Sequence, residues 1–173
     1  MVNTKFLYTL LVLAVAAERL FELRIANRNR ALAFSRGARE YGADHFPVMT
    51  VMHGAFLVSC VAEVWLLDRP FHPILAVIAS GLTLAAQALR YWCIATLRER
   101  WNVRVIVVPA MELATNGPYR FLRHPNYVAV VTEILALPLV HTAWLTAFAF
   151  SFLNAAMLAV RIRVEDKALG RNV

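Results

Sequence analysis

Long apolar stretches separated by short polar segments fill almost the whole chain. A helix that crosses a membrane needs about 20 mostly apolar residues in succession. Stretches of roughly this length lie at residues 5–23, 47–67, 73–97 and 144–160, and another begins near Tyr127 and is interrupted by Pro138. The pattern therefore predicts an all-α integral membrane protein with about five transmembrane helices. Whether the fourth and fifth segments both span or form a partial hairpin stays open.

The composition agrees with a membrane location. Hydrophobic residues make up 60% of the chain, whereas soluble domains contain roughly 45–50%. A length of 173 residues suits one domain, so we expect residues 1–173 to form a single membrane domain. Within it, residues 1–98 form the N-terminal helices, and residues 99–173 carry most of the polar motifs.

Basic residues are concentrated in three polar segments. Because basic loops of membrane proteins stay in the cytoplasm, the asymmetry predicts an N-terminus outside and a C-terminus inside. The net charge of +7 is spread over short loops between spans, which argues against a nucleic-acid partner. Fourteen of the eighteen lysines and arginines lie in the first loop, the third loop and the tail: Arg24, Arg28, Arg30, Arg36, Arg39, Arg98, Arg100, Arg104, Arg120, Arg123, Arg161, Arg163, Lys167 and Arg171.

Several ionisable or strongly polar residues interrupt the apolar stretches. Such groups inside a membrane are costly and usually face a partner or a cavity. One interpretation is that they pair and lock the helices together. The other places His53, Glu63 and Glu133 in a substrate cavity. The residues concerned are Glu18, Arg19, Glu22, His53, Glu63, Gln87, Arg90, Glu133 and Asn154.

Residues 102–109 contain a β-branched run between the third apolar stretch and the next polar segment. Together with residues 110–113 and the turn residue Gly117, this run predicts a short cytoplasmic hairpin at the membrane surface.

A dense polar motif, which we call the cassette, spans residues 117–127 (Gly-Pro-Tyr-Arg-Phe-Leu-Arg-His-Pro-Asn-Tyr). Gly117 and Pro118 mark a tight turn, and Pro125 disfavours helical geometry at His124. Two tyrosines, two arginines and a histidine therefore converge where the chain re-enters an apolar helix. This arrangement suits an anionic or zwitterionic ligand at a membrane surface.

The tail, residues 161–169, presents opposite charges on one helical face, because Arg161 and Glu165 are four residues apart. Taken alone, this spacing also fits an ordinary solvated end of a last helix.

The cassette and the tail together resemble the isoprenylcysteine carboxyl methyltransferase family, integral membrane enzymes that use S-adenosylmethionine. The tail matches that family at Arg161, Glu165, Asp166 and Leu169. Asp166 stands where a second glutamate is usual, and Ala129 replaces a common glycine.

The resemblance implies a role for each region and for individual residues. It makes residues 99–173 the cofactor-binding catalytic region and residues 1–98 the wall of a lipid-substrate cavity. Arg161 and Glu165 are the implied catalytic residues, and we expect Arg161 to grip the acceptor's oxygen anion. Further expected substrate contacts come from His53, Glu63 and Glu133. The implied cofactor-binding residues are Tyr119, His124, Pro125, Asn126, Tyr127 and Glu165.

The N-terminal half is similar to a narrower bacterial branch of this family. Members of that branch are often encoded beside type III polyketide synthases and methylate long-chain alkylpyrone or alkylresorcinol hydroxyls. The resemblance implies a lipophilic small-molecule substrate, membrane lipids and contact with such a synthase as partners, at a bacterial inner membrane. It is carried by Arg19, Glu22, Leu23, Arg28, Asn29, residues 37–40, Gly42, His45, Met49 and His53.

Other functions remain open at this stage. One is carboxyl methylation of a prenylated cysteine, another is a sterol-type membrane reductase that uses NADPH, and a third is a non-catalytic membrane anchor for a synthase. No Cys or His spacing typical of zinc occurs, so we expect no metal. An acidic pyrone hydroxyl needs no strong base, whereas a resorcinol with a pKa near ~10 does. His53, Glu63 and His45 are the candidates for that base.

Overall fold

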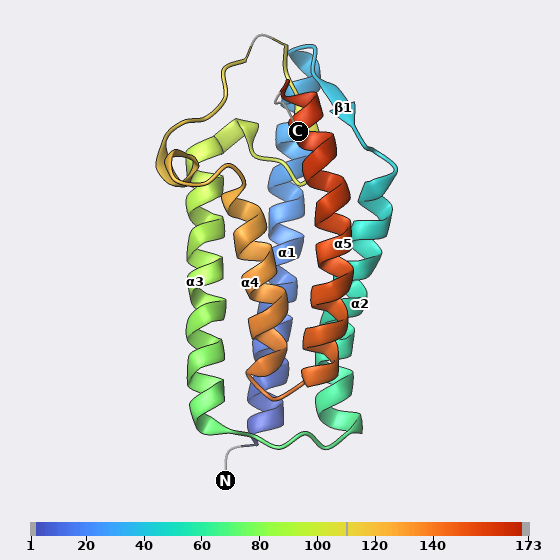
Figure 1. Ribbon diagram of the computed structural model, residues 1–173, viewed down its shortest axis with the longest axis vertical. Helices are drawn as coiled ribbons and strands as arrows, with labels where there is room; N and C mark the ends of the chain where they lie inside the picture. Colours follow the sequence, from blue (N-terminus) through green and yellow to red (C-terminus); the bar gives the residue numbers. More distant parts are fainter. Residues whose placement is uncertain (1–2, 110, 171–173) are drawn as a thin grey trace.

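The computed structural model describes residues 3–109 and 111–170 and folds into an upright bundle of helices (Figure 1). α4 lies between α3 and α5, and α1 and α2 complete the bundle. A short turn of 3-10 helix, η1 (Arg98–Arg100), follows α3, and another, η2 (Gly117–Arg120), precedes α4. The five α-helices of the described residues are α1 (Thr4–Ser35), α2 (His45–Leu66), α3 (Pro73–Leu97), α4 (Pro125–Leu139) and α5 (Trp144–Ala168).

Local sequence explains where the helices begin. The side chain of Asn3 accepts hydrogen bonds from the first backbone N–H groups of α1, at Lys5 and Phe6. α3 and α4 each start with a proline, Pro73 and Pro125, whose missing N–H costs nothing in a first turn.

α1 is longer than predicted, because it continues past residue 23 to Ser35. Its extra turns are held by Asn29, which is buried and donates to the carbonyl oxygens of Arg98 and Trp101 at 2.9 and 2.8 Å. A long-range contact of this kind cannot be read from local spacing.

Three helices of the described residues are long and apolar enough to cross a membrane: His45–Leu66, Pro73–Arg100 and Trp144–Ala168. α4 is apolar but has only 15 residues, and α1 carries Glu18, Arg19 and Glu22 within its length. Large apolar side chains on the outer faces are well exposed, as Leu66 is at 81%, which suits a lipid environment. An all-α membrane protein is thus confirmed, while the count of five spans stays a prediction.

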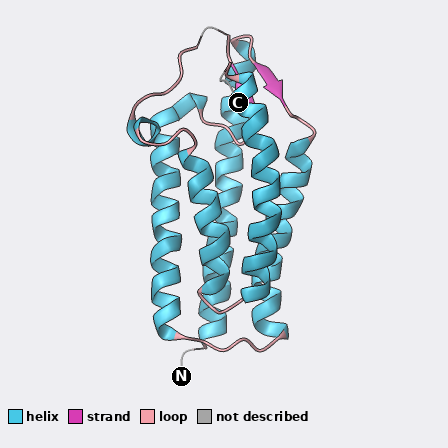
Figure 2. Ribbon diagram, in the orientation of Figure 1, coloured by secondary structure: helices cyan, strands magenta, loops and turns pink. Residues whose placement is uncertain are grey.

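The predicted hairpin within residues 102–117 is wrong. β2 (Val105–Val107) pairs antiparallel with β1 (Arg39–Tyr41), with Glu40 opposite Ile106. The magenta strands in Figure 2 therefore tie the α1–α2 connection to the segment that precedes the cassette. The β-branched run did form a strand, but its partner lies far away in the sequence.

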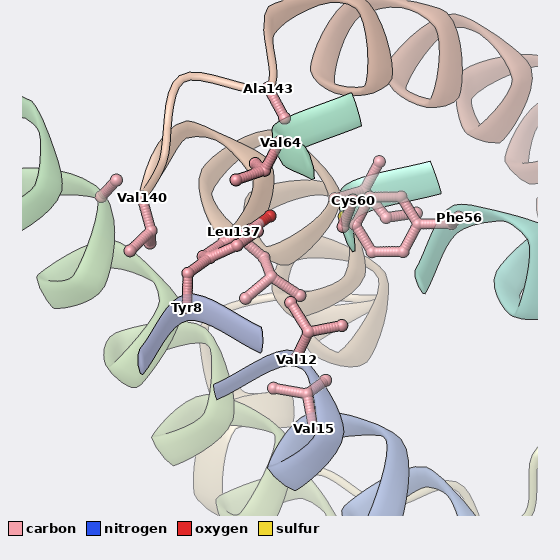
Figure 3. Close-up of a cluster of buried hydrophobic side chains, with 11 residues drawn as sticks. Tyr8, Val12, Val15, Phe56, Cys60, Val64, Leu137, Val140 and Ala143 are labelled. Atoms are coloured by element: carbon pink, nitrogen blue, oxygen red, sulfur yellow. The ribbon is translucent and has the colours of Figure 1, made fainter. Parts of the chain in front are cut away.

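The bundle has two ends with different interiors. The cassette end holds the C-terminal ends of α1, α3 and α5, and the opposite end holds their N-terminal ends (Figure 1). Towards the opposite end, buried apolar side chains from α1, α2, α3 and α4 interlock (Figure 3). Because lipid is as apolar as these side chains, close van der Waals packing stabilises this region. Its members include Tyr8, Val12, Phe56, Cys60, Val64, Ile134 and Leu137.

Candidate functional site

The cassette crosses the end of the bundle and enters α4. Its first residue, Gly117, has a φ of +56°, and a Cβ there would lie 2.3 Å from Oγ1 of Thr96. Both the backbone conformation and the close approach therefore require glycine. η2 (Gly117–Arg120) follows, and its Tyr119 is half-buried beside Cys93. Burial raises the pKa of the Tyr119 phenol above its ordinary value, which keeps it protonated.

Arg161, Tyr127 and Glu165 form the centre of the site. Nε of Arg161 donates to the Tyr127 hydroxyl at 2.8 Å, and that hydroxyl donates to Glu165. The two terminal nitrogens of Arg161 contact Sδ of Met49 at 2.9 Å and the carbonyl oxygen of Val103. Arg161 is therefore held by contacts with α2, with α4 and with the segment that precedes β2.

His124 joins the cassette to the tail. Its ring stacks on Tyr127 with centroids 5.3 Å apart and an interplanar angle of 15°. Nδ1 lies 3.6 Å from a carboxylate oxygen of Glu165, and Nε2 lies 3.2 Å from Asp166. The two acidic tail residues thus hold the histidine that precedes α4.

Two cavities meet at this centre. The smaller, about 120 Å³, lies among the cassette, β2 and the tail, and its lining includes Tyr119, His124, Pro125 and Glu165. The larger, about 320 Å³, lies between α1, α2, α4 and α5 and is lined mainly by apolar side chains. The residues that line both are Asn126, Tyr127 and Arg161. Oδ1 of Asn126 is buried and has no hydrogen-bond partner among the described residues.

A charged cluster lies beside the larger cavity, and three of its four members line that cavity. It consists of Arg19 and Glu22 of α1, Arg90 of α3 and Glu133 of α4. Arg90 binds Glu133 at 2.7 Å, Arg19 binds Glu22 at 2.9 Å, and Arg19 lies 3.5 Å from Glu133. The four formal charges cancel. The interpretation that polar residues pair and lock the bundle is thus confirmed for these four.

The structure separates the predicted substrate residues. His53 lines the larger cavity, as Arg161 does. Glu133 lies behind Arg90 and does not line either cavity. Glu63 is at the opposite end of the bundle, where it accepts from Arg69 and from the first backbone N–H groups of α5. Both carboxylates are bound by cationic or N–H groups of the protein, so the structure does not bring them together with His53 and Arg161 in the larger cavity.

Sequence reasoning missed several residues of the site. Met49 and the Val103 carbonyl fix Arg161. Met49 was expected only among the residues that carry the resemblance to the bacterial branch, and a backbone carbonyl belongs to no motif. Arg104 lines the smaller cavity and binds Glu40 at 2.6 Å. Arg19 and Arg90 line the larger one; their position inside apolar stretches was the signal that could have placed them there.

Comparison with known proteins adds independent information. The model of the isoprenylcysteine carboxyl methyltransferase (ICMT) family matches residues 77–171. An uncharacterized protein of Bacillus subtilis, YpbQ, is 40% identical over 164 residues, which are 94% of this chain and 96% of that protein. An uncharacterized protein of Haemophilus influenzae is 26% identical over 156 residues, 90% of each chain.

A third relative is the nickel-cobalt-cadmium resistance protein NccN of Alcaligenes xylosoxydans xylosoxydans, 33% identical over 92 residues, 53% of this chain and 39% of that protein. The described residues hold no group of three His, Cys, Asp or Glu placed to bind a metal ion. No solved structure matches the chain. The family match covers more than half of the chain, including the cassette and the tail, and the chain therefore belongs to the isoprenylcysteine carboxyl methyltransferase family.

Proposed function

We propose that this membrane methyltransferase transfers a methyl group from S-adenosylmethionine to a hydroxyl of a lipophilic acceptor, a long-chain alkylpyrone or alkylresorcinol. The observation that carries the proposal is the meeting of two cavities at Arg161, Tyr127 and Asn126. One cavity has a mixed lining of charged and apolar side chains and lies at the end of the bundle, whereas the other is mainly apolar and lies between helices. Two reactants of opposite solubility can therefore approach the same side chains.

The residues of the smaller cavity fit a zwitterionic nucleoside cofactor. Glu165 offers a negative charge for its ammonium, and Arg123 or Arg104 offers a positive charge for its carboxylate. Trp101, Leu97 and Leu169 supply apolar surface for a base. At about 120 Å³ the cavity is smaller than typical ligand pockets of roughly 300–1,000 Å³, so a bound cofactor would extend beyond it.

The larger cavity suits an acceptor with a long apolar chain. Leu20, Leu23 and Leu57 line it together with Val130 and Leu158. An acceptor whose chain lies among these side chains would direct its polar ring towards Arg161 and Tyr127. Their guanidinium and phenol are already held in place, so little ordering remains to be done when the acceptor binds.

The chain's own residues would act by position and charge. S-adenosylmethionine, when bound, supplies a methyl group activated by a sulfonium. Arg161 orients an acceptor oxygen and stabilises its negative charge. Glu165 fixes the Tyr127 hydroxyl, and the apolar wall of the larger cavity excludes water from the reacting oxygen.

Carboxyl methylation of a prenylated cysteine is the second candidate, because Arg161 would bind a carboxylate equally well. The two candidates are separated by incubating purified protein with labelled S-adenosylmethionine and with an alkylpyrone, an alkylresorcinol or a prenylcysteine. We expect label on alkylpyrones or alkylresorcinols and little on prenylcysteines, with S-adenosylhomocysteine binding measured by calorimetry. Label on prenylcysteine alone would overturn the choice of acceptor, and binding of NADPH in place of S-adenosylhomocysteine would overturn the methyltransferase mechanism.

We further propose that the cassette end faces the cytoplasm of a bacterial inner membrane. The concentration of arginines at that end supports this orientation. Single cysteines introduced at Asn3 and Lys167 test it, because a membrane-impermeant thiol reagent should label only the first from outside. The native Cys60 and Cys93 are buried and serve as the unlabelled background. Labelling of both positions from one side would contradict five membrane segments.

A further inference from the structure

His53 of α2 presents an unprotonated ring nitrogen in the larger cavity. Its Nδ1 lies 2.8 Å from the backbone carbonyl oxygen of Met49. A carbonyl oxygen can only accept, so in the neutral ring Nδ1 carries the proton and Nε2 carries the lone pair. None of the hydrogen bonds between described residues ends on Nε2.

His53 also lies near the residue that orients the acceptor. Met49, which precedes it by one helical turn, contacts Arg161 through its sulfur at 2.9 Å. His53 and Arg161 both line the same cavity. An acceptor oxygen bound by Arg161 therefore lies in the cavity that His53 lines.

The other candidate bases lie elsewhere. Glu63 is bound by Arg69 and by backbone N–H groups at the opposite end of the bundle. His45 lines a separate, very small cavity of about 10 Å³ with Glu40 and Arg104. Of the three, His53 alone lines the larger cavity.

We propose, on the basis of the function given above, that His53 is the general base that lets the enzyme methylate neutral, phenol-like hydroxyls. The hydroxyl proton moves to Nε2 of His53, and a lone pair of the acceptor oxygen forms the bond to the methyl carbon. The carbon–sulfur bond breaks, and its electron pair stays on the sulfur, which becomes a neutral thioether. His53 then releases its proton to water.

The charges around His53 suit this cycle. The polar residues that line the cavity with His53 include Arg19 and Glu22 of α1, Arg90 of α3, Tyr127 of α4, and Asn154 and Arg161 of α5. Glu133 of α4 binds Arg90 and lies 3.5 Å from Arg19. During transfer, the developing oxyanion lies between the imidazolium and Arg161 and is stabilised by both. Once the ether has formed, that negative charge is gone. Arg161 then disfavours the imidazolium, because the charges of the Arg19, Glu22, Arg90 and Glu133 cluster cancel one another. Proton release to water is therefore favoured after each turnover.

The test compares two acceptors with the same alkyl chain, a 5-alkylresorcinol and a 4-hydroxy-6-alkyl-2-pyrone. Single-turnover rates are measured at saturating S-adenosylmethionine for the wild type and His53→Gln. We expect His53→Gln to lower the resorcinol rate at pH 7 by about 10²–10⁴-fold and the pyrone rate by less than about tenfold, because the pyrone is already ionised. The same substitution at His45, on the same helix but outside the cavity, should leave both rates near wild type.

The pH profile gives a second readout. In His53→Gln, the resorcinol rate should rise about tenfold for each pH unit between roughly 7 and 9, because the ionised fraction of a phenol with pKa near 10 rises by that factor. The wild-type rate should instead level off once His53 is neutral. If His53 had a purely structural role, the pH profile of the resorcinol rate would have the same shape in the wild type and in His53→Gln.

A third measurement needs no turnover. With S-adenosylhomocysteine bound, ¹⁵N-histidine spectra should show the Nε2 signal of His53 shifting when the alkylresorcinol binds, but not when its dimethyl ether binds. His53→Gln and His53→Asn assign the signal, so the measurement stands even if one variant folds poorly. Equal rate losses on both acceptors, or an unshifted Nε2 signal, would overturn the assignment of the base while methyl transfer stands. A wild-type protein that methylates neither acceptor would overturn both proposals.

Discussion

The two ends of the bundle are built from the same helices but filled in different ways. At the end where α1 begins, apolar side chains interlock around Leu137 (Figure 3). At the cassette end, a cavity of about 320 Å³ separates α1, α2, α4 and α5. Close packing holds the first region, whereas ion pairs and a strand pair hold the second. A membrane bundle can thus keep a cavity between its helices where polar contacts replace packing.

The largest expected effect comes from breaking the charged cluster. Arg90→Met leaves Glu133 buried without its closest partner and should lower the free energy of unfolding by about 3–5 kcal/mol. Adding Glu133→Met should restore most of that loss, because Arg19 and Glu22 remain paired with each other. Thermal unfolding in detergent measures both variants. If the double variant is no more stable than the single one, the loss in Arg90→Met does not come from leaving Glu133 buried without its partner.

The next effect concerns the boundary between the two cavities. Arg161→Ala should lower the rate of methyl transfer by about a hundred- to a thousand-fold, by analogy with the loss of an oxyanion donor. Arg161→Lys should recover only part of the rate, because an ammonium cannot reproduce the planar grip. Arg163, two residues further and exposed, is the matched control, and single-turnover kinetics provides the measurement. Near-normal rates in Arg161→Ala would place the anion contact elsewhere.

A bulky side chain placed in the larger cavity tests whether that cavity binds the acceptor's chain. Gly54 lines the larger cavity, and a Cβ there would meet no atom within 4 Å. Gly54→Leu should therefore fold normally but lower methylation of long-chain acceptors by roughly 10–200-fold, the range for misfit in an apolar pocket. Gly81→Leu, on an exposed and equally open position of α3, is the control. Equal rates in the two variants would show that the acceptor chain lies outside this cavity.

The smallest effect concerns the strand pair. Burial alone would raise the pKa of Glu40, but hydrogen bonds from Arg104 and Arg30 outweigh it and lower the pKa below its usual value. The ionised form therefore stabilises the fold above the unfolded pKa of roughly 4.3. This contribution, on the order of 1 kcal/mol, is lost as the pH falls through the lowered folded pKa.

Glu40→Gln should accordingly remove that part of the acid dependence, measured as thermal stability between about pH 3 and 6. Glu99 pairs with Arg36 and is more exposed than Glu40, so Glu99→Gln should change the pH profile less. Identical profiles for the wild type and Glu40→Gln would show that the strand pair does not depend on this carboxylate.

Features that depend on local spacing could be predicted from the sequence. Apolar stretches gave the five helices, with ends near Leu97 and Trp144 as observed. The i, i+4 spacing placed Arg161 and Glu165 together, and the structure joins both to the hydroxyl of Tyr127. These relations lie within one helix or one turn, where geometry follows directly from the order of residues.

Features that depend on distant partners could not be predicted. The run at Val105–Val107 indicated a strand, yet nothing local named Arg39–Tyr41 as its partner. Glu63 and His53 share a helix and both interrupt an apolar stretch, but only the bundle shows that one caps α5 while the other lines a cavity. A polar residue inside a span indicates that a partner exists, and the tertiary structure decides which.

That Arg161 lines both cavities has a kinetic consequence. If the water-soluble reactant enters from the end of the bundle and the lipid-soluble one from between the helices, neither blocks the path of the other. Binding and release would then follow no obligatory order, and each product could leave into the phase in which it dissolves. Under this scheme the water-soluble and the lipid-soluble reactant meet at the guanidinium of Arg161, which contacts both cavities.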